Sequence, residues 1–204
     1  MIIKSRSGEV LYEDDADTIK ATVENAVRSD ANISYADLRN ADLRNAGLGG
    51  AGLGGADLRN ADLGYADLRH ADLGNADLRN ADLRHADLRN ADLGHANLGN
   101  ANLRGTNLRG TNLRHAYLGN AYLGNADLRG IFISWASHDL ISQILWNHAD
   151  TTQRQMLAAF VGRMYEWCWN DFKTFRHREK SWAIKVLREV ARDDDENVPE
   201  MIRK

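Results

Sequence analysis

The residues that could do chemistry in this sequence are mainly aspartates and arginines, which recur at regular intervals between positions 31 and 130. This segment holds 11 Asp and 11 Arg but no Glu or Lys, so its formal charge is zero. Paired acids and bases can transfer protons, and rows of guanidinium groups can bind anions. Catalysis also needs a concave pocket that excludes water, whereas we expect these rows on a convex surface. The rows therefore predict surface ion pairs or an anion-docking strip, and no catalytic residues.

Other reactive side chains are few and scattered. His95 and His115 lie 20 positions apart and could form half of a metal site, but no third ligand accompanies them, so we expect no metal. Cys168, between Trp167 and Trp169, has no evident base nearby and is predicted to be a buried apolar residue. A single Cys also excludes an intramolecular disulfide and favours a reducing compartment. Nucleophilic triads, phosphate loops, dinucleotide fingerprints and zinc spacings are missing, so no cofactor is predicted.

A five-residue repeat positions the Asp and Arg side chains, and it runs without a break over residues 31–130, giving 20 copies. The first residue is Ala except at Thr106 and Thr111, and the third is Leu except at Ile33. In most copies the second is Asp or Asn, the fourth is Arg or Gly, and the fifth is Asn, His or Gly. This period fits neither an α-helix nor a flat strand. It fits a chain that turns a corner every five residues with Ala and Leu inward, where Thr is tolerated if its hydroxyl finds a backbone partner.

The motif Ala-(Asp/Asn)-Leu-X-X resembles the pentapeptide-repeat family. The resemblance implies a mainly β fold, a right-handed quadrilateral parallel β-helix with four repeats per coil. Twenty repeats then make about five coils, and residues 20 positions apart stack on one another. Adjacent coils are expected to pair as parallel strands.

Stacking predicts columns of like residues on the outer faces. One strip carries Arg69, Arg89, Arg109 and Arg129, which we take as the candidate interaction surface, flanked by Asp67, Asp87, Asn107 and Asp127. A strip next to it carries an Asn column whose amides should form a ladder, at Asn40, Asn60, Asn80, Asn100 and Asn120. The arginine strip is either a solvated, charge-balanced surface or a docking site for an anionic partner.

The flanking segments are predicted to cap the two ends of the β-helix. Residues 1–30 should form a hairpin over 2–13 and a helix over about 16–29 with Asp14 or Asp15 as N-cap. Residues 31–135 should form the β-helix. Residues 136–192 should form a helical subdomain, with helices starting at Ser137, at Thr151 or Thr152, and over 178–192, and 193–204 a tail. Tyr117 and Tyr122 replace the usual Asp in the last coil and are expected to lie beneath this subdomain.

The leading functional prediction is a non-enzymatic protein-interaction or scaffold module, with a protein partner or self-association through the C-terminal helices. Some members of the family resemble DNA and bind DNA gyrase, so a DNA mimic acting on gyrase or another DNA-binding protein is the alternative, disfavoured by the neutral repeats. A net charge of −3 does not predict direct nucleic-acid binding. No signal-peptide pattern or membrane-length apolar run occurs, so a cytoplasmic protein is expected. A deep pocket lined by His138, Asp139 or His148 would argue for an enzyme instead.

Overall fold

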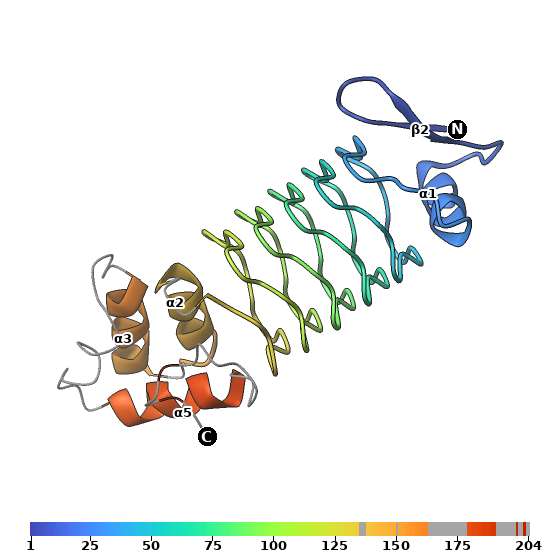
Figure 1. Ribbon diagram of the computed structural model, residues 1–204. Helices are drawn as coiled ribbons and strands as arrows, with labels where there is room; N and C mark the ends of the chain where they lie inside the picture. Colours follow the sequence, from blue (N-terminus) through green and yellow to red (C-terminus); the bar gives the residue numbers. More distant parts are fainter. Residues whose placement is uncertain (135–137, 150, 163–178, 191–198, 200–201, 203–204) are drawn as a thin grey trace.

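The computed structural model describes residues 1–134, 138–149, 151–162 and 179–190, together with Pro199 and Ile202. A rod of stacked coils lies between an N-terminal hairpin with one helix and a group of C-terminal helices (Figure 1). The elements are β1 (Ile2–Lys4), β2 (Val10–Glu13), α1 (Ile19–Arg28), α2 (His138–Asn147), α3 (Thr152–Gly162) and α5 (Lys180–Val190). Within these ranges no helix is long and apolar enough to cross a bilayer.

The rod is held together by parallel bridges between residues 20 positions apart. They begin at Asp37 with Asp57, continue around every face, and end at Asn112 with Phe132. Each circuit therefore contains four five-residue repeats, and the second residues of the repeats form the ladder. The prediction of a β-helical solenoid in which residues 20 apart stack is confirmed.

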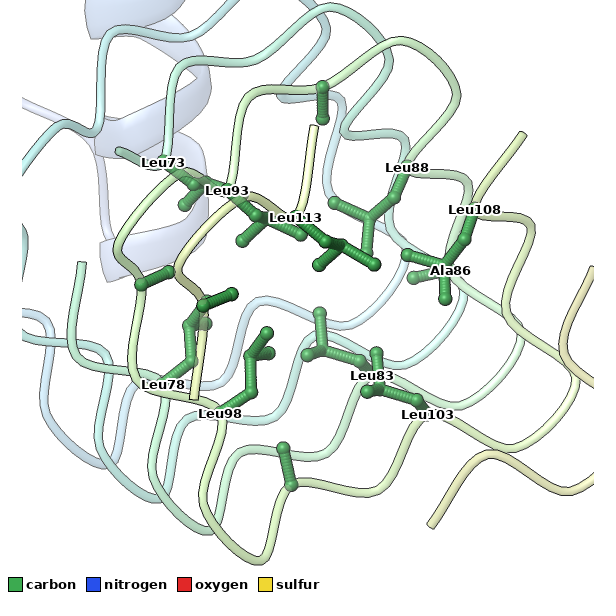
Figure 2. Packing of buried hydrophobic residues seen from close by; sticks show 14 of the residues in the cluster. Leu73, Leu78, Leu83, Ala86, Leu88, Leu93, Leu98, Leu103, Leu108 and Leu113 are labelled. Atoms are coloured by element: carbon green, nitrogen blue, oxygen red, sulfur yellow. The ribbon is translucent and has the colours of Figure 1, made fainter. Parts of the chain in front are cut away.

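The interior of the rod contains the first and third residues of the repeats (Figure 2). The third-position leucines from Leu38 to Leu128 are at most 3% exposed, and each contributes about 1.5–3 kcal/mol by leaving water. Thr106 and Thr111 are fully buried in place of Ala. Their hydroxyls donate hydrogen bonds of 2.7 Å to the carbonyl oxygens of Leu83 and Leu88, as the sequence argument required.

The corners of the rod explain the choice of the fifth residue. Every fifth residue from Tyr35 to Gly130 has a positive φ, between 56° and 62° where a side chain is present. Asn and His are the side-chain-bearing residues that best tolerate this left-handed region, and Gly has no steric penalty there. The corners thus favour Asn, His and Gly, and Tyr35 and Tyr65 are the two exceptions.

The second residue is selected by backbone hydrogen bonding. Four of the five N–H groups in a repeat donate to backbone carbonyls, across a corner or to a neighbouring coil, as Leu38 does to Asp57. The remaining N–H belongs to the fourth residue and donates to the second residue's Oδ1 at 2.7–3.4 Å wherever that residue is Asp or Asn. A backbone N–H without a partner is costly where water is excluded, so this position favours a short side-chain acceptor. The exceptions are Gly47, Gly52, Tyr117 and Tyr122.

The N-terminal segment closes the first coil. The amide of Asp37 donates to the carbonyl of Lys4 at 2.7 Å, and the amide of Gly47 donates to Glu24 Oε1 of α1 at 2.9 Å. Both groups would otherwise lack a preceding coil to pair with. The strand and the helix therefore supply partners for edge groups of the rod, which limits edge-to-edge association.

The predicted N-cap of the first helix is wrong. The helix begins at Ile19, and Thr18 is its N-cap, with a side chain that accepts from the Ala21 amide at 3.2 Å. The Asp14 carboxylate accepts instead from Thr22 Oγ1 and Asn25 Nδ2, at 2.8 and 2.6 Å. Asp14 thus accepts hydrogen bonds from side chains of the helix, and Thr18 caps its first turn.

At the other end, α2, α3 and α5 extend the core. Their buried residues join the same cluster as the leucines of the rod: Ile141, Ile144, Leu145, Leu157, Ala158, Val161, Ala183, Val186, Leu187 and Val190. The Thr151 hydroxyl accepts from the Arg154 amide at 3.3 Å at the start of α3. Ser137, Trp167, Cys168, Trp169 and most of the predicted tail lie outside the described residues.

Candidate functional site

The predicted arginine strip is largely a row of internal ion pairs. The guanidinium groups of Arg69, Arg89 and Arg129 each grip the carboxylate two residues earlier, with Nε and Nη2 contacts of 2.5–3.0 Å. These hydrogen bonds from arginine lower the pKa values of Asp67, Asp87 and Asp127. Two parallel hydrogen bonds hold each guanidinium group on its carboxylate, so the carboxylate neutralises most of the arginine's charge and little remains for a ligand.

Arg109 differs from the other three arginines because Asn107 replaces the Asp of its repeat. The Asn107 amide oxygen accepts only the Arg109 backbone N–H, at 3.2 Å. The Arg109 guanidinium forms no ion pair within the described part of the chain, and it lies close enough to Asp127 to lower the pKa of that carboxyl. One of the four predicted residues thus keeps an available charge.

The Asn strip does not adjoin the arginine strip. The repeats that carry the two columns are ten positions apart in a circuit of 20 residues, so the columns lie on opposite sides of the rod. One amide–amide bond, from Asn60 Nδ2 to Asn40 Oδ1 at 3.4 Å, is found in the described column. The asparagines are selected by their positive φ, and the predicted ladder is a minor contact.

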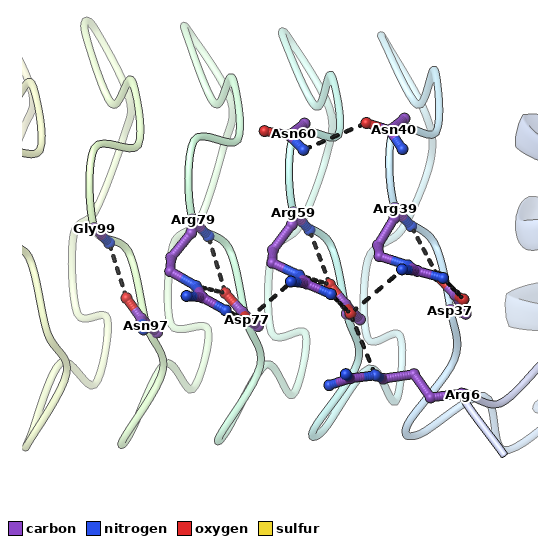
Figure 3. A network of polar contacts seen from close by, with 11 residues as sticks. Arg6, Asp37, Arg39, Asn40, Arg59, Asn60, Asp77, Arg79, Asn97 and Gly99 are labelled. Atoms are coloured by element: carbon purple, nitrogen blue, oxygen red, sulfur yellow. Dashed lines mark hydrogen bonds and ion pairs between the residues drawn. The ribbon is translucent and has the colours of Figure 1, made fainter.

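The face with the Asn column carries the most connected ion-pair network (Figure 3). Asp57 is 1% exposed and accepts from the Arg59 backbone N–H, Nε and Nη2. Arg39 and Arg6 approach the same carboxylate at 3.8 and 3.5 Å. Hydrogen bonding from Arg59 lowers the pKa of Asp57. Because Arg6 belongs to the hairpin loop, Asp57 joins the N-terminal cap to the rod.

Charge is separated along the axis although the repeats are neutral in sum. Residues 1–95 hold 17 acidic and 11 basic residues, a net charge of −6, and residues 96–135 hold 1 Asp and 4 Arg, a net charge of +3. The coil of residues 96–115 contains Arg104, Arg109 and Arg114 and no acid. A basic belt therefore lies next to the C-terminal helices, and summing charge coil by coil would have found it in the sequence.

A groove of about 750 Å³ opens beside this belt, where the last coil meets α2 and α3. Its lining includes Arg104, Tyr122 and Trp146, and none of the described residues that line it is acidic. Tyr122 and Trp146 are 63% and 51% exposed. Tyr117 is also exposed, at 54%. The expectation that Tyr117 and Tyr122 lie beneath the helices is therefore wrong.

A second groove, of about 770 Å³, lies on another side of the same junction. It is lined by Asp127, Arg129, His148, Lys185 and Glu189 among others. His148 Nδ1 contacts the carbonyl oxygen of Ile144 at 2.8 Å, which leaves Nε2 as its second polar atom. The described lining offers no Ser, Thr or Cys nucleophile to go with this imidazole, and the side chains of His138 and Asp139 lie outside the described residues.

The predicted histidine stack is confirmed, with the His95 and His115 rings 4.7 Å apart and 16° from parallel. Tyr65 and His85 stack in the same way at 4.9 Å. In the described parts of the chain, no group of three or more metal-ligating side chains comes together. The stacks are corner residues of successive coils.

Comparison with known proteins agrees with the repeat geometry. The family model for pentapeptide repeats matches eight copies over residues 29–64, 61–98 and 91–130. The chain is similar to the pentapeptide repeat protein Rfr23 of the cyanobacterium Cyanothece 51142, with 35% identity over 44% of this chain and a TM-score of 0.24, and spans 61% of that protein.

Two other solved structures resemble the chain at similar levels. Alr5209 from Nostoc PCC 7120 is 28% identical over 60% of this chain and all of that protein, with a TM-score of 0.31. QnrB1, a plasmid-mediated fluoroquinolone resistance protein, is 24% identical over 49% of this chain and 63% of that protein, with a TM-score of 0.29. No curated protein matches the sequence. The repeats, their ladder and the family match together establish that the chain belongs to the pentapeptide-repeat family.

Proposed function

We propose that this chain is a non-enzymatic protein-interaction or scaffold module. The observation that carries the proposal is that the outward side chains of the rod are held by their own repeats. Asp and Asn accept the backbone N–H two residues on, and paired arginines grip the same Asp through two further bonds, as in Asp77 and Arg79. A surface that is already ordered loses little conformational entropy when a partner binds. The rod therefore offers preformed faces to another protein.

The junction between rod and helices adds the residue types that concentrate binding energy. Tyr, Trp and Arg are enriched at the centres of protein interfaces, and the junction exposes Tyr122, Trp146 and Arg104. Self-association through the C-terminal helices is one form of the proposal, and light scattering of the purified chain tests it. The arginine strip is a separate docking candidate, and Arg109→Gln tests it because this residue alone of the four has no carboxylate in its repeat.

The main test is affinity capture from nuclease-treated extract of the source cells, followed by mass spectrometry. The intact chain should retain a specific protein. A matched control bait is Leu88→Asp, which puts a carboxylate at a fully buried core position and should disrupt the rod. Retention of the same proteins by the control, or no retention by the intact chain, would refute the proposed function.

A DNA mimic acting on DNA gyrase or another DNA-binding protein is the second candidate, favoured by the net charge of −6 over residues 1–95. The repeats within this acidic segment, residues 31–95, have 10 Asp and 7 Arg, which gives them a net charge of −3. That length of rod is roughly 16 Å at about 4.8 Å per coil, over which duplex DNA carries about nine negative charges. The charge density is about a third of that of DNA, which is why mimicry ranks second. A gyrase supercoiling assay without inhibition or protection at micromolar protein would eliminate it.

A further inference from the structure

We infer that the groove formed by Arg104, Tyr122 and Trp146 binds an acidic peptide segment of a partner protein. The inference rests on the proposed interaction function and specifies its site and the chemistry of the partner. Its starting point is the environment of Arg104, which differs from that of the arginines in the earlier coils.

The first four fourth-position arginines, Arg39 to Arg69, each lie between two carboxylates, one from the arginine's own repeat and one from the next coil, 18 positions on. The next three keep the carboxylate of their own repeat. Arg44 shows the pattern, with Nη2 2.6 Å from Asp42 and Nε 3.5 Å from Asp62. The same register places Asn102 and Tyr122 around Arg104. Neither of these side chains can neutralise a guanidinium.

The Arg104 side chain is directed along the rod toward the groove. A Cβ on Gly124, one coil further on, would lie 3.7 Å from Arg104 Cγ and 3.8 Å from its Nε. Among the described residues Arg104 forms no ion pair, and its backbone N–H is already used by Asn102 Oδ1 at 3.3 Å. The guanidinium group of Arg104, with five N–H donors, therefore lines a groove in which none of the described lining residues has a carboxylate.

The other lining groups suit a peptide. Tyr122 and Trp146 present apolar surface that can hold an aromatic or aliphatic side chain. Asn120 and Gln155 have amides that can both donate to and accept from a peptide backbone. Since Arg104 brings a positive charge to the groove and its coil, residues 96–115, contains no acid, the ligand that complements the site is a segment with Asp or Glu beside a large apolar residue.

The chain contains matched control positions. Arg109 occupies the same Asn-Leu-Arg-Gly context as Arg104, one face away and outside the groove lining. Tyr117 occupies the same second position as Tyr122 in the preceding repeat, and it is also exposed. Arg104→Gln and Tyr122→Ala can therefore be compared with Arg109→Gln and Tyr117→Ala, pairs that make the same chemical change.

The experiment selects ligands from a phage-displayed library of random dodecapeptides on the immobilised full chain. Selected peptides should be rich in Asp or Glu next to Phe, Tyr, Trp or Leu. Fluorescence anisotropy of the synthetic peptides should show an affinity loss of about tenfold or more for Arg104→Gln and Tyr122→Ala, and less than about twofold for the two controls. Peptides with Asn and Gln in place of the acids should lose a similar factor. Circular dichroism verifies that all variants remain folded.

Selected peptides without acidic residues, or an equal loss with Arg109→Gln, would overturn the inference. So would Arg104-dependent binding of a single-stranded DNA oligonucleotide when no peptide binds. If affinity capture shows a partner that Arg104→Gln retains as well as the intact chain does, this groove is refuted and the interaction function stands.

Discussion

The second residue of each repeat combines two roles that the sequence shows only as a preference for Asp or Asn. Its Oδ1 satisfies a backbone N–H, and an Asp also grips the arginine two residues on, as Asp57 does with Arg59. Asn can accept the backbone N–H, but it cannot form an ion pair with the arginine. The two roles can therefore be separated by substitution at one residue.

Asp57 is the best place for that separation, because its carboxylate is 1% exposed and contacts three arginines. We expect Asp57→Asn to cost about 1 kcal/mol and Asp57→Ala about 2–3 kcal/mol in free energy of unfolding, since alanine also leaves the Arg59 N–H without an acceptor. Urea denaturation measures both values. Equal costs for the two variants would show that the backbone bond contributes nothing.

The fifth residue provides a second test at the residue scale. Asn75 is exposed and has a φ of 59°. Asn75→Gly should change the free energy of unfolding by less than about 0.5 kcal/mol, whereas Asn75→Val should destabilise by about 1–2 kcal/mol because a β-branched side chain strains the left-handed region. Chemical denaturation compares the two variants. A neutral Asn75→Val would mean that the corner can change its conformation.

Among the elements, helix α1 contributes more than an apolar lid. Its Glu24 accepts the Gly47 amide at 2.9 Å, which replaces the bond that a preceding coil would have supplied. Glu24→Ala should increase amide exchange at Gly47 by roughly fivefold, the equivalent of about 1 kcal/mol for one hydrogen bond. Glu24→Gln keeps an oxygen acceptor and should preserve most of the protection. Hydrogen exchange followed by NMR measures both, and unchanged exchange in Glu24→Ala would contradict the capping role.

The elements also show what could be predicted from sequence. The five-residue period, inward leucines and stacking at 20 positions followed from the sequence and the family resemblance, because a repeated pattern carries the same steric requirement many times. Single-copy features were harder. Asp14 looked like a cap, but competition between nearby acceptors gave that role to Thr18. The groove at Arg104 depends on the last coil and α2 coming together around it, which no local pattern encodes.

On the scale of the whole molecule, the ion pairs should make stability depend on acid. Arginine hydrogen bonds lower the pKa of eight aspartates in the rod, and they lower that of Asp42 to about 2: Asp37, Asp42, Asp57, Asp67, Asp77, Asp82, Asp87 and Asp127. A carboxyl with a lowered pKa stabilises the fold fully above its unfolded value of about 3.9, and this contribution disappears as pH falls through the folded value.

At constant ionic strength, titration of these carboxyls should therefore change the urea midpoint little between neutral pH and about pH 4. Between about pH 4 and pH 2 the midpoint should fall steeply. Protonation also leaves the 11 arginines of the repeats without counter-charges, and their repulsion adds to the loss. Asp57→Asn, which has one titrating pair fewer, should show a shallower decline. A midpoint that is still constant at pH 2 would show that the Asp–Arg pairs, despite their short contacts, contribute no net stability to the rod.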